Sequence, residues 1–321
     1  MKLDIRTVEP SQLKAELLRL RDVEKMDFLE NLIGMDWGEE GGLGVVYMLY
    51  STSTGKRENL RCSTTDRVNP VIPTASDLWD IANIYEREVY DFYGIIFAGH
   101  PDMRRIYLRE DWVGYPMRKD DDPIKENPFD AQHMTNEPLA DTTKEYELLP
   151  DGTLKVKENV IFDDDDYVVN IGPQHPSTHG VLHFRVALDG ELIKRIDPVL
   201  GYIHRGVEKL NESMTYPQTL ALTDRLDYIS AQQSRHALCA CIEQAMGVEV
   251  SDRVKVIRTI MDELQRIDSH LLFFGCLCQD LGATTAFLYA FRDREKILDI
   301  FEETCGGRLI INYNMIGGVQ Y

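Results

Sequence analysis

The pattern of apolar and polar positions predicts a small domain of strands and one helix at the front of the chain. The segments 44–50 and 58–62 lie on either side of a Ser-Thr-Gly turn and predict a hairpin-like pair of strands. Ser76 then opens a segment whose apolar residues recur at helical spacing from Ile81 to Val89. A hairpin followed by an amphipathic helix is typical of a small α+β domain.

Strand-like segments also lie near the middle of the chain. Segment 167–171 and the alternating segment 181–188 predict two strands. An Asp-Gly pair at 189–190 is a hairpin signal that returns the chain into a third strand at 191–196. We therefore expect a small sheet at this point.

The rear of the chain has the spacing of helices. Pro217 can occupy the first turn of a helix that runs to Gly247. Ser251 caps a second helix, and its apolar residues keep helical spacing as far as Leu271. Residues 291–304 form a third, ended by a Gly-Gly pair. The predicted fold class is α+β, with a small α+β N-terminal domain followed by a mainly α-helical domain that begins with a small β-sheet.

Length and charge set the domain plan. The chain has 321 residues, enough for two domains that each bury a core. Acidic runs at 120–122 and 163–166 bracket a polar stretch that is typical of a solvated linker. We predict domains at 1–120 and 166–321 and an acidic linker at 121–165. The net charge of −19 argues against nucleic acid as a partner and against direct docking on an anionic membrane surface.

Hydropathy and cysteine spacing argue against a spanning helix and a metal site. No run reaches the roughly 18 apolar residues of a spanning helix, and the first residues do not resemble a signal peptide. The six cysteines include no C-x-x-C pair, so neither zinc nor an iron–sulfur cluster has its usual ligand spacing. We expect reduced thiols and no cofactor or metal bound by this chain itself.

The loop between the first two strands of the middle sheet concentrates the candidate chemistry. It holds His175 and His179, with Gly172 and Gly180 near its ends and prolines that restrict it. Two imidazoles on a stiff loop can orient a ligand or move a proton. The alternative is that both histidines only cap backbone groups of the turn.

The string Gly-Pro-Gln-His-Pro-x-x-His-Gly in this loop resembles the signature of the D-type subunit of respiratory complex I, a relative of the nickel-iron hydrogenase large subunit. Further strings in the same order support the resemblance, at 200–210, 224–228 and 280–283. The front of the chain resembles the C-terminal signature of the C-type subunit, at 86–95, 99–106 and 114–119. The chain is thus similar to a fused C/D subunit, and its second domain is expected to be hydrogenase large-subunit-like.

The resemblance implies a quinone site. His179 and Tyr228 would lie at the quinone head group, where an imidazole and a phenol can hold its two oxygens and donate protons. Asp280 would pair with His179. The arginines Arg205, Arg225 and Arg308 would lie near the terminal iron–sulfur cluster of a partner subunit.

Each of these assignments has a structural alternative. Tyr228 could be an ordinary core residue of an amphipathic helix. Asp280 interrupts an apolar run, so we expect it to need a partner if it is buried, and it could instead cap a neighbouring turn. The arginines could form surface salt bridges.

The function that the resemblance implies is that of a peripheral-arm subunit of a proton-translocating NADH-quinone oxidoreductase. Quinone would be the substrate, and an iron–sulfur cluster and any FMN would belong to partner subunits. The implied partners are other complex I subunits, above all the B-type cluster carrier and the membrane arm, on the cytoplasmic side of a bacterial inner membrane.

Two rival functions stay open at this stage. The match stops at Tyr321, whereas the D-type subunit usually continues, so the D half is expected to be truncated. The chain by itself is expected to be inactive. A non-catalytic scaffold fragment is one rival. A relative of the membrane-bound hydrogenases is the other, although the cysteine pairs that such a protein needs are not in this sequence.

Overall fold

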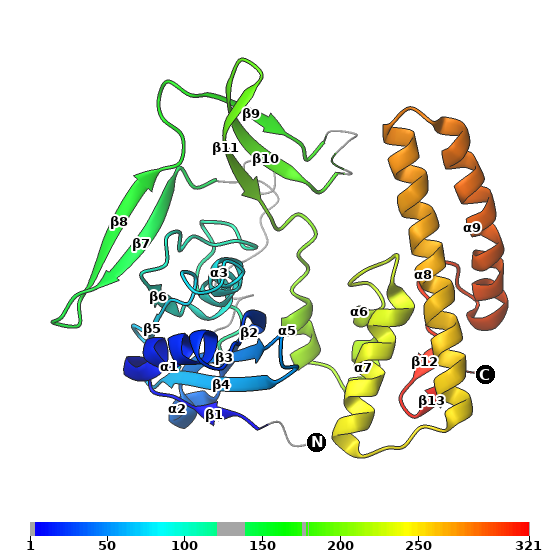
Figure 1. Cartoon of the computed structure of the whole chain (residues 1–321), viewed down its shortest axis with the longest axis horizontal. Helices are drawn as coiled ribbons and strands as arrows, with labels where there is room; N and C mark the ends of the chain where they lie inside the picture. Colours follow the sequence, from blue (N-terminus) through cyan, green and yellow to red (C-terminus); the bar gives the residue numbers. More distant parts are fainter. Residues whose placement is uncertain (1–3, 121–138, 175–177, 179, 321) are drawn as a thin grey trace. The chain divides into compact units, whose positions relative to one another are not determined.

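The structure is a computed structural model that describes residues 4–120, 139–174, 178 and 180–320. The chain folds as two compact units, an N-terminal unit that ends at Arg205 and a helical unit that begins at Gly206. Both units combine helices and strands (Figure 1), which confirms the predicted α+β class.

A four-stranded sheet forms the middle of the N-terminal unit. Its strands, in the spatial order β1-β4-β3-β2, are β1 (Arg6–Thr7), β2 (Phe28–Asp36), β3 (Leu43–Tyr50) and β4 (Arg57–Thr64). Strand β3 pairs antiparallel with both β2 and β4, and the second pairing confirms the hairpin predicted at 44–50 and 58–62. Buried and exposed residues largely alternate along β2, as expected where one face of a sheet covers a core.

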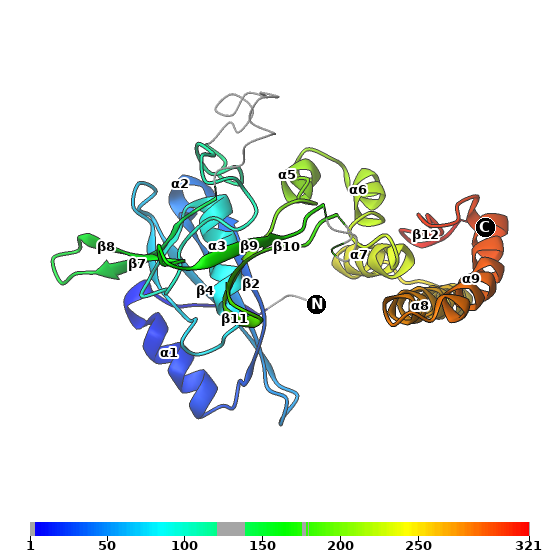
Figure 2. The same ribbon diagram turned by 90° about the horizontal axis from the view of Figure 1, so that it is seen from above.

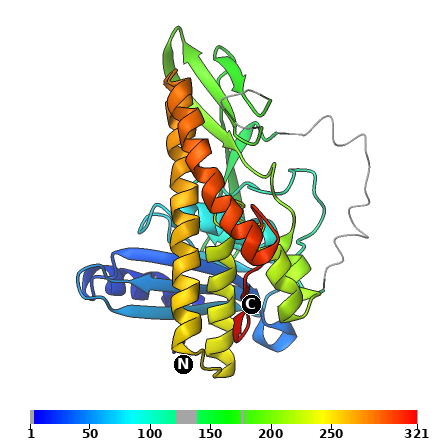
Figure 3. The same cartoon turned by 90° about the vertical axis from the view of Figure 1, so that its right-hand side faces the viewer.

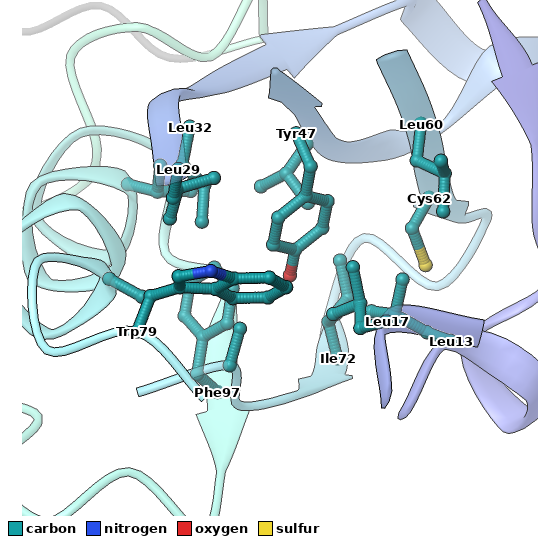
Figure 4. Close-up of a cluster of buried hydrophobic side chains, with 14 of the residues drawn as sticks. Leu13, Leu17, Leu29, Leu32, Tyr47, Leu60, Cys62, Ile72, Trp79 and Phe97 are labelled. Carbon is teal, nitrogen blue, oxygen red and sulfur yellow. The ribbon is translucent and has the colours of Figure 1, made fainter. Parts of the chain in front are cut away.

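Two helices, α1 (Pro10–Asp22) and α3 (Ala82–Tyr93), pack on this sheet (Figure 2). Leu13, Leu17 and Leu20 of α1 recur at helical spacing and are fully buried, so one face of the helix lies in the core. Figure 4 shows Tyr47 of the sheet and Trp79 side by side in the same core.

Short elements complete the first part of this unit. They are α2 (Gly38–Gly41), the parallel pair β5 (Val71–Pro73) and β6 (Ile96–Ala98), and the hairpin β7 (Thr142–Leu148) and β8 (Leu154–Val160). The hairpin falls within the segment predicted as an acidic linker, 121–165, and its Tyr146 packs against the core. Part of that segment therefore has regular structure, while the boundaries of the two predicted domains stay a prediction.

A three-stranded antiparallel sheet follows, and it confirms the three strands predicted there. Its strands are β9 (Tyr167–Ile171), β10 (His183–Asp189) and β11 (Leu192–Val199), with β10 in the middle. Asp197 of β11 is buried and accepts hydrogen bonds from Arg185 at 2.6 Å and from Arg104 at 3.0 Å. Burial raises the pKa of Asp197, but the two guanidinium groups outweigh it and lower the pKa overall. This ion cluster ties the sheet to the segment after β6.

The helical unit consists of five helices and a small hairpin within the described residues. They are α5 (Val207–Glu212), α6 (Tyr216–Thr223), α7 (Ala231–Met246), α8 (Asp252–Asp280), α9 (Thr284–Cys305), β12 (Asn314–Met315) and β13 (Gly318–Val319). Figure 3 shows α7, α8 and α9 lying alongside one another. The Val254 amide donates to Ser251 Oγ, which confirms Ser251 as the N-cap of α8.

The prediction of one helix from Pro217 to Gly247 is wrong, because the helix is interrupted between Thr223, where α6 ends, and Ala231, where α7 begins. Within the break, the Asp227 carboxylate accepts from the Ile229 amide at 3.2 Å and its carbonyl accepts from the Ser230 amide. A side chain that binds a nearby amide competes with the helical hydrogen bond, so this aspartate favours a turn.

Two further helix boundaries differ from the prediction. The helix expected to open at Ser76 begins at Ala82, because the Thr74 hydroxyl binds the amide and hydroxyl of Ser76 and holds a turn there. The helix predicted at 291–304 begins earlier, at Thr284. The misplaced start at Ser76 reflects a local hydrogen bond that apolar spacing does not encode.

Candidate functional site

The loop between β9 and β10 was predicted to hold the two candidate histidines. His175 and His179 lie outside the described residues, so their positions stay a prediction. Gly172, at the start of the loop, has φ +84°, and a Cβ there would lie 2.0 Å from the Leu182 oxygen. Only glycine fits this position. Gly180, near the end of the loop, has φ +80° but open space around it.

A third histidine, His183, joins the two ends of this loop. It is the buried first residue of β10, and its Nδ1 lies 2.9 Å from Tyr202 Oη. Its Nε2 lies 3.2 Å from Oδ1 of Asn170, which precedes the loop in β9. His183 was not among the site residues predicted from the sequence. The signal was available, since a histidine at an inward position of an alternating strand needs polar partners.

Tyr228 lies in the break between α6 and α7, not on a helix. Its side chain is 67% exposed, which contradicts the alternative of an ordinary core residue. Asp224, four residues earlier, is the C-cap of α6 and is buried. The structure thus presents the Tyr228 phenol on a loop at the surface of this unit.

The start of that loop is fixed by a buried ion pair. Asp224 Oδ2 accepts from Arg235 Nη1 of α7 at 2.6 Å, and both side chains are buried. Burial raises the pKa of Asp224, and Arg235 opposes that rise. Arg235 also donates through Nε to the carbonyl of Asn314 in β12. Asp224, which precedes the exposed loop, is therefore bound to α7 directly and to β12 through Arg235.

Asp280 is the last residue of α8 and is exposed. We expected Asp280 to need a partner if it were buried in the apolar run. Because its side chain is exposed, burial does not require such a partner. Its predicted partner, His179, lies outside those residues. The pairing of Asp280 with His179 therefore stays a prediction.

The three candidate arginines lie at the surface or near it. Arg205 and Arg225 are exposed, and Arg225 donates to the Ala221 carbonyl at 2.6 Å. Arg308 binds three carboxylates of α9, those of Glu295, Asp299 and Glu302. For Arg308 the structure shows the surface ion pairs that were the alternative. The proximity of these arginines to a cluster in a partner stays a prediction.

Large apolar side chains gather on the exposed surface of α8, α9 and the turn between them. Around the turn, the side chains of six such residues are 44% to 78% exposed: Phe273, Phe274, Leu277, Leu281, Leu288 and Tyr289. Exposed apolar groups of this size in neighbouring turns are typical of surfaces that contact another protein. The unit therefore has a candidate interface near Asp280.

None of the described helices is long and apolar enough to cross a lipid bilayer. Among the residues that the structure places, no group of three His, Cys, Asp or Glu side chains is arranged to hold a metal ion. The expectation that this chain binds no cofactor of its own stays a prediction.

Two family models match the chain. The model described as respiratory-chain NADH dehydrogenase, 30 Kd subunit, matches residues 6–127. The model described as respiratory-chain NADH dehydrogenase, 49 Kd subunit, matches residues 280–321. The first match extends the resemblance to residues ahead of 75, which carry no motif of this kind.

Curated relatives cover both parts of the chain. Proteins described as the C/D subunit of NADH-quinone oxidoreductase from Bacteroides fragilis and Bacteroides thetaiotaomicron are each 66% identical over 326 residues, which is 99% of this chain and 61% of the relative. A protein of the same description from Sulfurihydrogenibium sp. is 42% identical over 261 residues, 78% of this chain and 45% of the relative. The chain spans about three-fifths of the length of the two Bacteroides relatives.

Proposed function

We propose a function for this chain from its family: it belongs to the fused C/D subunits of NADH-quinone oxidoreductase. The proposed function is that of a peripheral-arm subunit of a proton-translocating complex I. In this role it forms part of the quinone head-group site and docks the subunit that carries the terminal iron–sulfur cluster. The names of the relatives favour this function over a scaffold fragment or a hydrogenase-related subunit.

The observation that carries the quinone site is the presentation of Tyr228. Its phenol is 67% exposed on a loop that begins at a buried ion pair, so the hydroxyl is accessible while its backbone is anchored. Reduction of a quinone to a quinol adds two electrons and two protons, one proton at each carbonyl oxygen. Tyr228 is proposed to donate a hydrogen bond to one oxygen, and His179 to serve the other.

The exposed apolar side chains of α8 and α9 support the proposed partners. A surface that carries Phe273, Phe274 and Leu281 in contact with water is favourably covered by another protein. We assign this cover to other complex I subunits, among them the cluster carrier and the membrane arm. The proposed location is the cytoplasmic side of a bacterial inner membrane, peripheral to the bilayer.

Substitution of Tyr228 in the assembled complex tests this proposal. Tyr228→Phe removes one hydroxyl and keeps the ring, so quinone reduction should fall roughly tenfold or more if the phenol donates during the reaction. Electron transfer from NADH to an artificial acceptor upstream of quinone should stay normal. Tyr216→Phe is the matched control, because Tyr216 is also exposed, at 69%, and has no proposed role. Normal quinone reduction by a fully assembled Tyr228→Phe complex would contradict the proposal.

A further inference from the structure

The end of the Tyr228 loop is held by a single glutamine of α8. The Nε2 group of Gln265 donates to the carbonyl of Ile229, the residue after Tyr228, at 3.1 Å. Gln265 is only 2% exposed, although it lies in a helix far along the chain from the loop. A buried amide that reaches the backbone next to the candidate phenol limits where that phenol can point.

The identity of this residue follows from its partners. Besides the Ile229 carbonyl, Nε2 of Gln265 lies 3.2 Å from Oδ2 of Asp268. Both partners are acceptors, so the group between them has to be a donor with two hydrogens, which an amide nitrogen provides. A carboxylate or an apolar side chain of the same length at this position would take this donor from the Ile229 carbonyl and would leave Asp268 with Arg294 alone.

Asp268 is itself held in place from α9. Arg294 Nη2 donates to Oδ2 of Asp268 at 3.2 Å, and Arg294 Nε approaches Oδ1 at 2.9 Å as an ion pair without hydrogen-bond alignment. Both side chains are buried. A line of buried polar contacts thus runs from α9 through Asp268 and Gln265 to the backbone beside Tyr228.

We propose that Gln265 is a positioning residue that fixes the Tyr228 loop and, through it, the direction of the Tyr228 phenol toward quinone. The loop is clamped at both ends, by the Asp224–Arg235 ion pair at its start and by Gln265 at its end. The structural part stands on these contacts, and the effect on quinone rests on the proposed function of Tyr228.

Gln265→Met tests the clamp, because methionine keeps most of the volume and deletes the donor. Hydrogen exchange of peptides that cover 224–230, measured in the assembled complex, should become about three- to tenfold faster. Gln244→Met is the matched control, since Gln244 is exposed on α7 and should leave this exchange unchanged. If Gln265→Met fails to assemble, Gln265→Asn keeps an amide but is one methylene too short, and it should give the same acceleration.

Quinone kinetics separate positioning from simple stability. Gln265→Met should raise the KM for quinone about threefold or more in the wild-type background. In a Tyr228→Phe background the same substitution should leave the KM for quinone unchanged. Unchanged exchange of 224–230 overturns the clamp whatever the kinetics show. If Gln265→Met impairs quinone kinetics equally in both backgrounds, Gln265 does not act through Tyr228, and its role is structural. Faster exchange together with full activity of Tyr228→Phe keeps the clamp and rejects the proposed function of Tyr228 instead.

Discussion

Arg258 offers a sharp test of what holds the helical unit together. Its side chain is 1% exposed, and its guanidinium donates to both oxygens of Glu243, at 2.7 and 3.0 Å. The same group donates to the carbonyls of Met315 and Gly318, at 2.9 and 3.0 Å. Arg258 therefore joins α8 to α7 and to the β12–β13 hairpin.

We expect Arg258→Leu to lower the free energy of unfolding of this unit by about 3–5 kcal/mol, because it leaves a buried carboxylate without its cation. That loss is a large fraction of the roughly 5–15 kcal/mol that stabilises a whole domain. With a denaturant slope of about 2 kcal/mol per molar urea, the unfolding midpoint should fall by about 2 M.

The same pair predicts a dependence on pH. Hydrogen bonds from Arg258 hold the pKa of Glu243 below its ordinary value of 4.5. A depressed pKa in the folded state gives stability that is present above the unfolded pKa and is lost as the pH falls through the folded pKa. The advantage of the wild type over Arg258→Leu should therefore be full at neutral pH and shrink in acid below about 4.5.

Urea unfolding of the chain, monitored by hydrogen exchange in peptides from α8, measures the loss of unfolding free energy in Arg258→Leu. Arg266→Leu is the control on the same helix, because Arg266 and its partner Glu263 are 52% and 55% exposed. An exposed pair of this kind contributes only about 0–1 kcal/mol. If Arg258→Leu costs no more than Arg266→Leu, the reasoning from the buried pair is refuted.

Two further predictions concern the N-terminal unit. Burial raises the pKa of Glu86 to about 8, so the stability that it contributes declines as the pH rises from 4.5 through that value. Glu86→Gln should remove the decline, and its urea midpoints at pH 5 and pH 9 should differ less than those of the wild type. Gly172→Ala should cost about 2–4 kcal/mol from strain and overlap with the Leu182 carbonyl, whereas Gly180→Ala should cost about 1 kcal/mol of strain alone. Equal losses of thermal stability in the two glycine variants would contradict the close approach at Gly172.

The sequence predicted those elements whose signals are local. Strand-like segments beside turn residues identified β3, β4, β9, β10 and β11, and the Ser251 cap marked the start of α8. The break after α6 was missed, because it depends on the turn at Asp227 and on a buried contact between Asp224 and Arg235. Neither the proline at 217 nor the glycine at 247 carries a signal for such a contact.

The candidate site was predicted only in part. The motif drew attention to Tyr228, but its exposure follows from the helix break, and the apolar pattern alone predicted a core residue. Gln265 has no local signal at all. Its role depends on acceptors 36 residues before it and three residues after it, which come together only when α8 packs on the loop.

A structure of the assembled complex with quinone bound tests the central claim most directly. We predict a quinone head-group oxygen within about 2.5–3.2 Å of Tyr228 Oη, with the Ile229 carbonyl still bound by Gln265. A head group bound elsewhere, with the Tyr228 hydroxyl covered by a neighbouring protein chain, would contradict it.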